Sequence, residues 1–157
     1  LSTTKPVRTR ALLFIYQKNK KNRITNCMKP LKNKMILVVD DEELLREIIS
    51  EELTYYGATV DTAENGLLAL AKLKTNVFDC LVTDIRMPGG NGVDLIKSIG
   101  TELEKKPVIF ICSGFNDLNS DDLKKLNVAY HFTKPFNRDE FIEIISDRLG
   151  LTKIQAG

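Results

Sequence analysis

The stretch Asp79-Cys-Leu-Val-Thr-Asp84-Ile-Arg-Met-Pro-Gly-Gly-Asn-Gly92 decides the fold. Residues 78–83 form a short apolar run rich in β-favouring residues, which predicts a buried strand. The run ends on one carboxylate, Asp84, and residues 87–92 predict a loop by their proline and glycine content. Aspartate is also a common turn residue. Taken alone, Asp84 therefore leaves a structural and a functional role open.

Three further apolar runs end on polar residues in the same way. These runs and the residues after them are 35–39 with Asp40-Asp41, 108–112 with Ser113-Gly114, and 129–132 with Thr133-Lys134-Pro135. Helical stretches separate the runs, and this alternation predicts an α/β fold with a parallel sheet and helices on both faces. Right-handed crossovers would then bring the polar strand ends to one edge of the sheet.

That edge would hold three carboxylates, one hydroxyl and one ammonium group. Three carboxylates within a few ångströms repel one another unless a cation neutralises them or some become protonated. A hard ion such as Mg²⁺ suits this set, because it binds oxygen ligands, keeps several waters and leaves a position for phosphate oxygens. We therefore expect Mg²⁺ as a cofactor at this edge.

The chain resembles the receiver domain of bacterial two-component response regulators, a family that includes the single-domain chemotaxis regulator. The resemblance is carried by Val38-Val39-Asp40-Asp41-Glu42, Ala63-Glu64-Asn65-Gly66, Thr83-Asp84-Ile85-Arg86-Met87-Pro88, Cys112-Ser113-Gly114 and Phe132-Thr133-Lys134-Pro135-Phe136. It covers residues 35–149, and the order and spacing of its motifs are specific. It implies a doubly wound, flavodoxin-like sheet of five parallel strands in the order 2-1-3-4-5.

The resemblance also implies a role for each polar residue at the edge. Asp84 would accept a phosphoryl group from a sensor histidine kinase or a histidine phosphotransfer protein, while Ser113 and Lys134 would contact that group. The metal ligands would be Asp40, Asp41, Asp84 and the backbone carbonyl of Arg86. The Lys134-Pro135 bond is usually cis in the family. A phosphoacceptor of this kind signals to a downstream target, which the sequence leaves open, and is not an enzyme acting on a separate substrate.

Two residues stand out against the family pattern. His131 lies three residues before Lys134, where family members commonly have Tyr or Phe as a switch aromatic. Histidine can rotate as an aromatic ring does, but it also titrates near neutral pH. A proton-sensitive switch that moves with Ser113 and a half-buried histidine without a switching role both stay open. Arg86 lies two residues after the acceptor, where a long cation could alter the rate of phosphate hydrolysis.

Helical periodicity and turn residues predict the remaining elements. Helices are expected at 42–56, 65–74, 93–99, 116–126 and 138–149, with a short edge strand at 58–62. The first helix should bury an apolar stripe while its acids stay in solvent, and the second should turn Leu67, Leu70 and Leu73 inward. The stretch from Ser113 to Lys134 is about one residue short for the family, and helix 116–126 has few apolar anchors. Such weak anchoring is typical of a switchable element.

Charge divides the chain into parts. The 157 residues, 43% of them hydrophobic, suit one domain. Residues 1–34 carry ten Lys or Arg and no acid, whereas residues 35–157 have a net charge of −8. The acidic part is not a surface for binding phosphate backbones, so we expect no nucleic-acid binding by the domain itself. We expect a basic leader at 1–34, the receiver domain at 35–150 and a short tail at 151–157.

The leader has three open interpretations: a flexible or expression-derived segment, an interfacial anchor, or a nucleic-acid-binding arm. Its apolar run at 11–16 is too short for a secretory signal or a membrane span. Cys27, Cys80 and Cys112 show no metal-ligand spacing. Cys80 and Cys112 fall in expected strands and should be small buried hydrophobes. These features favour a cytoplasmic protein without a membrane span.

Three other functions share parts of this pattern. A degenerate receiver would act only as a protein-interaction module, but the acids, hydroxyl and lysine are all present. A Mg²⁺-dependent phosphatase with an aspartyl intermediate usually has Asp-x-Asp after its first strand, which Asp40-Asp41 is not. A flavodoxin-like flavin carrier needs a phosphate loop rich in hydroxyls and glycine where this chain has two repelling acids.

Overall fold

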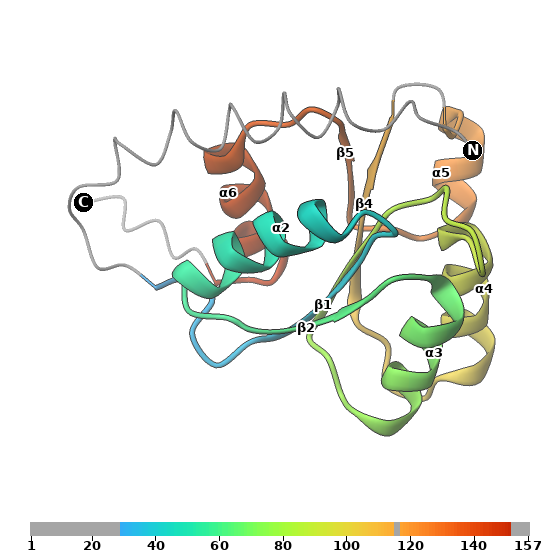
Figure 1. Ribbon diagram of the computed structural model, residues 1–157, viewed down its shortest axis with the longest axis horizontal. Helices are drawn as coiled ribbons and strands as arrows, with labels where there is room; N and C mark the ends of the chain where they lie inside the picture. The colour runs from blue at the N-terminus through green and yellow to red at the C-terminus, as the bar shows by residue number, and fades with distance from the viewer. Residues whose placement is uncertain (1–28, 115–116, 152–157) are drawn as a thin grey trace.

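The computed structural model describes residues 29–114 and 117–151, and its sheet has the predicted architecture (Figure 1). Five parallel strands are ordered β2-β1-β3-β4-β5. They are β1 (Met35–Val39), β2 (Thr59–Ala63), β3 (Cys80–Thr83), β4 (Val108–Ser113) and β5 (Tyr130–Thr133). The helices are α2 (Glu43–Tyr55), α3 (Gly66–Thr75), α4 (Gly92–Glu102), α5 (Ser120–Lys125) and α6 (Arg138–Arg148). The predicted fold class and strand order are confirmed.

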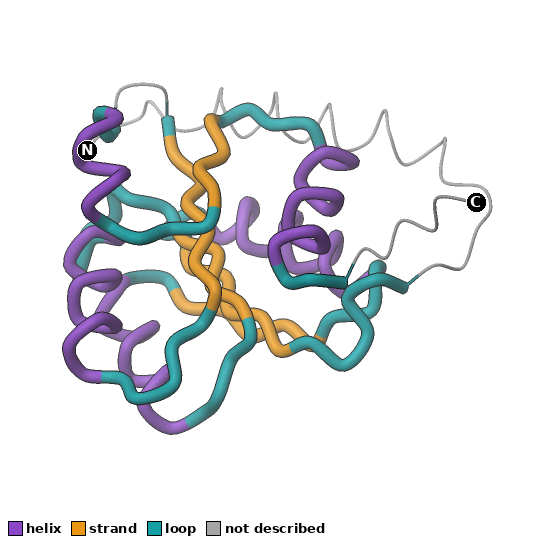
Figure 2. The backbone as a smooth tube through the Cα atoms, turned by 180° about the vertical axis from the view of Figure 1, so that it is seen from behind, coloured by secondary structure: helices purple, strands orange, loops and turns teal. Residues whose placement is uncertain are grey.

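Helices cover both faces of the sheet, α2 and α6 on one and α3, α4 and α5 on the other (Figures 1 and 2). Successive strand residues point to opposite faces. Leu37, Leu81 and Ile111 therefore pack with the helices of the second face, while Val38 and Phe110 pack with those of the first. Because both faces are buried, the central strands are continuous apolar runs, as parallel sheets require.

Asparagine side chains begin four of the helices. Asn65, Asn91, Asn119 and Asn137 each accept a hydrogen bond from a backbone N–H in the first turn. This satisfies donors that have no partner within the helix. Three of these helices start soon after a strand has ended at the polar edge, so the caps also fix where the connecting loops leave that edge.

Helix α3 turns Leu70 and Leu73 toward the core as predicted, but not Leu67. Ala69 and Leu73 are buried, but Leu67 is 69% exposed, so the prediction that Leu67 turns inward is wrong. The reason is a close approach of two backbones at the start of the helix. The Gly66 N–H donates to the Gly90 carbonyl at 2.8 Å, and a Cβ at Gly66 would meet that oxygen at 2.9 Å. This contact sets the rotation of α3 about its axis.

The prediction that the acids of α2 stay in solvent is wrong for Glu52. Its residue surface is 3% exposed, and its carboxylate forms an ion pair with Arg138 of α6, which is itself buried. Glu52 lies on the same helical face as Ile49 and Leu53. A charged group on that face is tolerated only with a partner of opposite charge. The pair joins the two helices of the first face.

Helix α5 is shorter than the predicted 116–126. It spans Ser120–Lys125, and none of its six residues is buried. Leu126, at its C-cap, is buried, and Leu118 and Leu123 pack against the core only partly. Residues 115 and 116 lie outside the described part of the chain. The expected weak anchoring of this segment is therefore found in its contacts.

Residues 29–34 were expected in the leader, yet they pack on the domain. Leu31 is completely buried, and its N–H donates to the Tyr56 carbonyl at 3.0 Å. Thr59, at the start of β2, donates to the Lys34 carbonyl at 2.8 Å. The packed fold thus begins before Met35. The predictions for residues 1–28, including Cys27, and for 152–157 lie outside the described residues.

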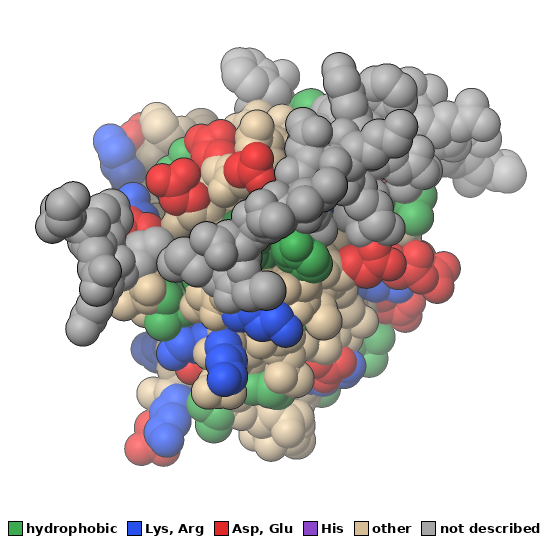
Figure 3. All heavy atoms as spheres, turned by 90° about the vertical axis from the view of Figure 1, so that its left-hand side faces the viewer, with side chains coloured by type: hydrophobic (Ala, Val, Ile, Leu, Met, Phe, Trp, Pro, Cys, Tyr) green, Lys and Arg blue, Asp and Glu red, His purple; other side chains and the backbone are tan. Residues whose placement is uncertain are grey.

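The two cysteines of the described chain lie where the sequence predicts. Cys80 and Cys112 are free thiols buried in strands β3 and β4. The face in Figure 3 shows acidic side chains together with scattered Lys and Arg. Within residues 29–114 and 117–151, no helix has the length and apolar character needed to cross a membrane.

Candidate functional site

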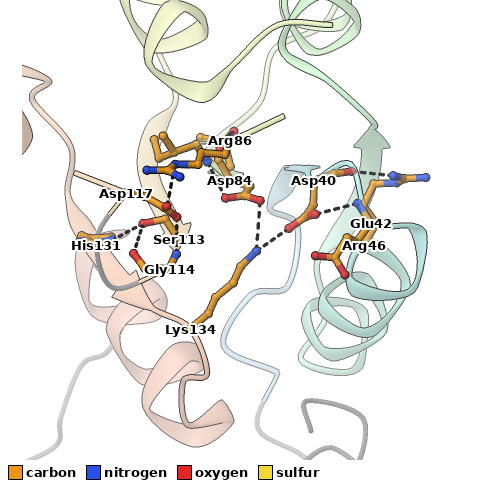
Figure 4. Close-up of polar contacts among 12 residues, drawn as sticks. Asp40, Glu42, Arg46, Asp84, Arg86, Ser113, Gly114, Asp117, His131 and Lys134 are labelled. Carbon is orange, nitrogen blue, oxygen red and sulfur yellow. Dashed lines mark hydrogen bonds and ion pairs between the residues drawn. The ribbon is translucent and has the colours of Figure 1, made fainter. Parts of the chain in front are cut away.

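Four strand ends meet at one edge of the sheet and bring the predicted polar residues together (Figure 4). Asp40 follows β1, Asp84 follows β3, Ser113 ends β4 and Lys134 follows β5. Backbone hydrogen bonds continue the parallel pairing past the strands: Asp84 N–H donates to Val39 at 2.9 Å, and Lys134 N–H donates to Ser113 at 2.8 Å. The register of the sheet therefore places the site.

The three aspartates form a cluster of oxygen ligands. One carboxylate oxygen from each of Asp40, Asp41 and Asp84 lies within 4.8 Å of the others. Two ligands on opposite sides of a Mg²⁺ ion are about 4.2 Å apart, twice the usual metal–oxygen distance. The cluster thus fits a small hard cation after a slight contraction, or with one aspartate acting through water.

Asp40 is the most deeply fixed member of the cluster, with 2% of its surface exposed. Its Oδ1 accepts from the Glu42 N–H at 2.9 Å, and its Oδ2 accepts from the Lys134 ammonium at 2.8 Å. In addition, Arg46 of α2 donates from Nη1 to the Asp40 carbonyl at 2.6 Å. Sequence reasoning missed Arg46. The only available signal was its place on the second turn of the helix that follows the acid pair.

Lys134 lies between two carboxylates. Its Nζ is 2.8 Å from Asp40 Oδ2 and 3.4 Å from Asp84 Oδ2, and its side chain is 12% exposed. Burial alone would lower the pKa of this ammonium, but Asp40 and then Asp84 outweigh burial and raise the pKa above its ordinary value. Lys134 is therefore a permanent positive charge here. The expected cis peptide bond between Lys134 and Pro135 is present.

Asp84 is held in a mostly buried position where ionisation is costly. Burial is the largest influence and raises its pKa to about 6; Lys134 opposes this, and the charge of Asp40 adds to it. Its Oδ1 accepts from the Ile85 N–H at 2.7 Å. Near pH 7 the carboxylate is mostly ionised. This buried charge is stabilised when a cation binds beside it, or removed from the carboxylate when the carboxylate forms a covalent bond.

Gly92 lets the loop after β3 close tightly on Asp84. A Cβ at Gly92 would lie 2.1 Å from the Asp84 carbonyl oxygen, which no side chain can do. The Gly92 N–H also donates to the Ile85 carbonyl at 2.9 Å. Gly92 therefore holds the backbone around Asp84 in place, which is a packing role rather than a chemical one.

Ser113 and His131 are in direct contact. Ser113 Oγ is 2.6 Å from His131 Nε2, and Ser113 is completely buried while the histidine is half-buried. Burial lowers the pKa of His131, and the nearby charge of Asp117 partly opposes this. The histidine is thus neutral at physiological pH and occupies one of the hydrogen bonds that the Ser113 hydroxyl can make.

Arg86 points away from the acid cluster. Its side chain is 71% exposed, and its Nε lies 2.9 Å from Asp117 Oδ1. The other oxygen of Asp117 accepts from the Gly114 N–H at 2.6 Å. Sequence reasoning did not single out Asp117, because it lies among several Asn, Asp and Ser residues that look alike as turn formers. The role of the Arg86 carbonyl as a metal ligand stays a prediction.

A concavity lies beside the site, between the loop after β3 and the segment before α5. Its volume is about 570 Å³, and its lining includes Ile85, Arg86, Met87, Asp117 and Leu118. None of the three clustered aspartates lines this concavity, which is therefore a neighbouring surface and not the acid site itself.

Comparison with known proteins agrees with the fold. The sequence model of the response regulator receiver domain matches residues 36–146, which is most of the chain, and the chain belongs to this family. It is 37% identical over 108 residues to chemotaxis protein CheY-3 of Vibrio cholerae, covering 67% of this chain and 83% of the relative. Over 112 residues it is 35% identical to the DNA-binding transcriptional regulator NtrC of Salmonella typhimurium, covering 71% of this chain but only 24% of that relative.

Two solved structures show the same fold. Response regulator TrrA of Thermotoga maritima, in complex with Mg(2+)-BeF, has a TM-score of 0.66 and 36% identity, covering 73% of this chain and 98% of that one. A signal receiver domain from Bermanella marisrubri has a TM-score of 0.69 and 28% identity, covering 75% and 99% of the two chains. The receiver fold of this chain is thus established independently of its site.

Proposed function

We propose that this receiver domain accepts a phosphoryl group on Asp84 and uses it as a signalling switch. The observation that carries the proposal is the meeting of Asp84 with Asp40, Asp41, Ser113 and Lys134 at one edge of the sheet. A metal-binding cluster alone would not need a hydroxyl and a buried ammonium on its other side. A phosphoryl group, with its several charged oxygens, uses all of them.

In the proposed reaction a carboxylate oxygen of Asp84 bonds to the phosphorus of a phosphohistidine on a partner kinase or phosphotransfer protein. The phosphorus–nitrogen bond breaks, and its electron pair stays on the partner's imidazole, which takes up a proton. Asp84 is suited to this role because burial makes the charge of its carboxylate costly. In an acyl phosphate the negative charge lies on the phosphoryl oxygens and no longer on the carboxylate. The domain assists only its own phosphorylation and dephosphorylation.

Asp40, Asp41 and Asp84, with the carbonyl of Arg86, would hold Mg²⁺. When bound, this ion supplies positive charge for the phosphoryl oxygens and offsets the repulsion among the carboxylates. Lys134, whose Nζ is 3.4 Å from Asp84 Oδ2, supplies a second point charge, and Ser113 supplies a hydroxyl. The complex of the related Thermotoga regulator with Mg(2+)-BeF supports this choice of ion.

The proposed output is a change on the face formed by α5, β5 and α6. Ser113 would move toward the phosphoryl group, and the segment that follows it would move too. The weak anchoring of α5, none of whose residues is fully buried, supports this choice of moving element. Partners would be the phosphodonor and a downstream protein. The free buried thiols Cys80 and Cys112 fit a reducing compartment, and we propose that the cytoplasm is the place of action.

Mg²⁺ binding gives a direct test of the cluster. We expect Asp41→Asn to weaken Mg²⁺ binding by about tenfold or more, because an ion that dehydrates reluctantly loses a hard ligand. Wild-type affinity should also fall as pH drops through about 6, where Asp84 takes up a proton. Isothermal titration calorimetry at pH 8 and pH 5.5 measures both effects. Asp61→Asn, a surface acid on β2, is the control. Equal affinity for Asp41→Asn and wild type would contradict the assignment.

The Ser113–His131 contact predicts a pH effect on the switch. A neutral imidazole can follow Ser113 inward, whereas a charged one resists burial. We expect fluoroberyllate to bind wild type less tightly at pH 6 than at pH 8, by a few tenths of a kcal/mol more than it does His131→Tyr, because burial already lowers the pKa of His131 and leaves only part of it charged at pH 6. The titration of Asp84 contributes to both proteins and cancels in the comparison. Identical pH profiles would show that His131 is not proton-sensitive in the switch.

A further inference from the structure

The carboxylate of Asp117 is bound by two donors next to the phosphoryl site. One oxygen accepts from the Gly114 N–H at 2.6 Å, and the other lies 2.9 Å from the Nε of Arg86 (Figure 4). The Asp117 side chain is 16% exposed, although it stands on the segment that leads to α5. A loop carboxylate is thus drawn in toward the end of β4.

The two contacts differ in strength. The Arg86 side chain is 71% exposed, and ion pairs of such exposed side chains contribute little. A hydrogen bond to a charged acceptor contributes more. The Gly114 contact, which is short and partly buried, is therefore the stronger of the two. Arg86 adds charge and fixes the second oxygen.

Both donors lie on loops that border Asp84, although the Arg86 side chain now points toward Asp117. Gly114 directly follows Ser113 at the end of β4, and Arg86 lies two residues after Asp84 on the neighbouring loop. A backbone N–H and a guanidinium suit phosphate oxygens as well as they suit a carboxylate. A phosphoryl group also carries about −1.5 to −2 charges, more than the single charge of Asp117. The phosphoryl group would therefore displace the Asp117 carboxylate from the Gly114 N–H and the Arg86 guanidinium.

We propose that Asp117 is a built-in competitor of the phosphoryl group. In the resting protein it occupies the Gly114 N–H and the Arg86 guanidinium, and a phosphoryl group on Asp84 displaces it. Its release frees the segment that leads into the weakly anchored α5. The Asp117 carboxylate thus makes phosphorylation less favourable, because it must be displaced. The same displacement allows α5 to move. This inference rests on the proposed function, because it concerns the same anion.

The test compares fluoroberyllate binding, with saturating Mg²⁺, to wild type, Asp117→Asn and Asp121→Asn. The Asp117 variant keeps the shape of the side chain but loses its charge. The Asp121 variant removes an exposed charge from α5, a few residues away, without touching Gly114. Calorimetry at pH 8 keeps His131 neutral and Asp84 ionised in all three proteins. We expect Asp117→Asn to bind threefold to tenfold more tightly than wild type, and Asp121→Asn to bind as wild type does.

A second readout follows the displacement itself. In wild type the Gly114 amide proton should resonate far downfield, as a short bond to a carboxylate requires, and should shift when fluoroberyllate binds. Equal affinity of wild type and Asp117→Asn would overturn the inference, and so would an equal gain in Asp121→Asn, which would mean a general charge effect. If none of the three proteins binds fluoroberyllate, the proposed function fails, and this inference fails with it.

Discussion

Replacing Asp84 with alanine is expected to abolish phosphate incorporation from a small donor such as acetyl phosphate. Asp84 belongs to the acid cluster and lies 3.4 Å from the Lys134 ammonium. Asp40 is tied to Lys134 and to the Glu42 N–H, so its oxygens are already engaged. Asp40 and Asp41 should also be committed to the metal, which lowers their nucleophilicity.

Intact-mass analysis with Mg²⁺ and excess donor measures the effect. Wild type should gain one phosphoryl group, and Asp84→Ala should gain none. Asp94→Ala is a matched control, because this exposed acid lies on the same segment, in the first turn of α4; it should be phosphorylated as wild type is. A phosphoryl adduct on Asp84→Ala would show that another residue accepts the group.

Replacing Lys134 with methionine should have the largest effect on stability. The pKa of this lysine is raised in the folded state, so its charge stabilises the fold at all pH values below its ordinary pKa. Its removal leaves two buried carboxylates without their cation. Breaking a buried pair in this way costs about 3–5 kcal/mol of the free energy of unfolding. The phosphorylation rate should fall as well.

Urea unfolding at pH 8 without metal measures this loss. Lys72→Met is the control: its partner Asp61 lies at the surface, with side chains 38% and 42% exposed, and such pairs contribute about 0–1 kcal/mol. The loss in Lys134→Met should shrink near pH 5, where Asp84, with a pKa of about 6, is protonated. Added Mg²⁺ should also restore part of the free energy of unfolding that Lys134→Met has lost. Similar small losses in the two variants would contradict the role of Lys134.

The sheet and the main site residues were predictable because each depends on local sequence. An apolar run predicts a buried strand, and the polar residue after it marks the carboxyl edge. Asp40, Asp84, Ser113 and Lys134 could therefore be placed without coordinates. The contact of His131 with Ser113 could be suspected from the family pattern, but its geometry could not.

The features that sequence reasoning missed depend on contacts between distant segments. Glu52 looks like a solvent-exposed acid until Arg138 is placed opposite it. Leu67 has the spacing of a core residue, but the backbone contact between Gly66 and Gly90 turns it outward. Asp117 has no distinguishing pattern, since its function would come from Gly114 and Arg86. In each case the deciding partner lies on another element of the fold.

The burial of Leu31 bears on where the gene can be cut to express the isolated domain. The recognisable motif region begins at Met35, which makes that methionine a natural first codon to choose. A protein made from Met35 would lack a leucine that is completely buried against Tyr56 and its neighbours. Burying a side chain of this size contributes about 1.5–3 kcal/mol. An expression clone should therefore start upstream of Lys29.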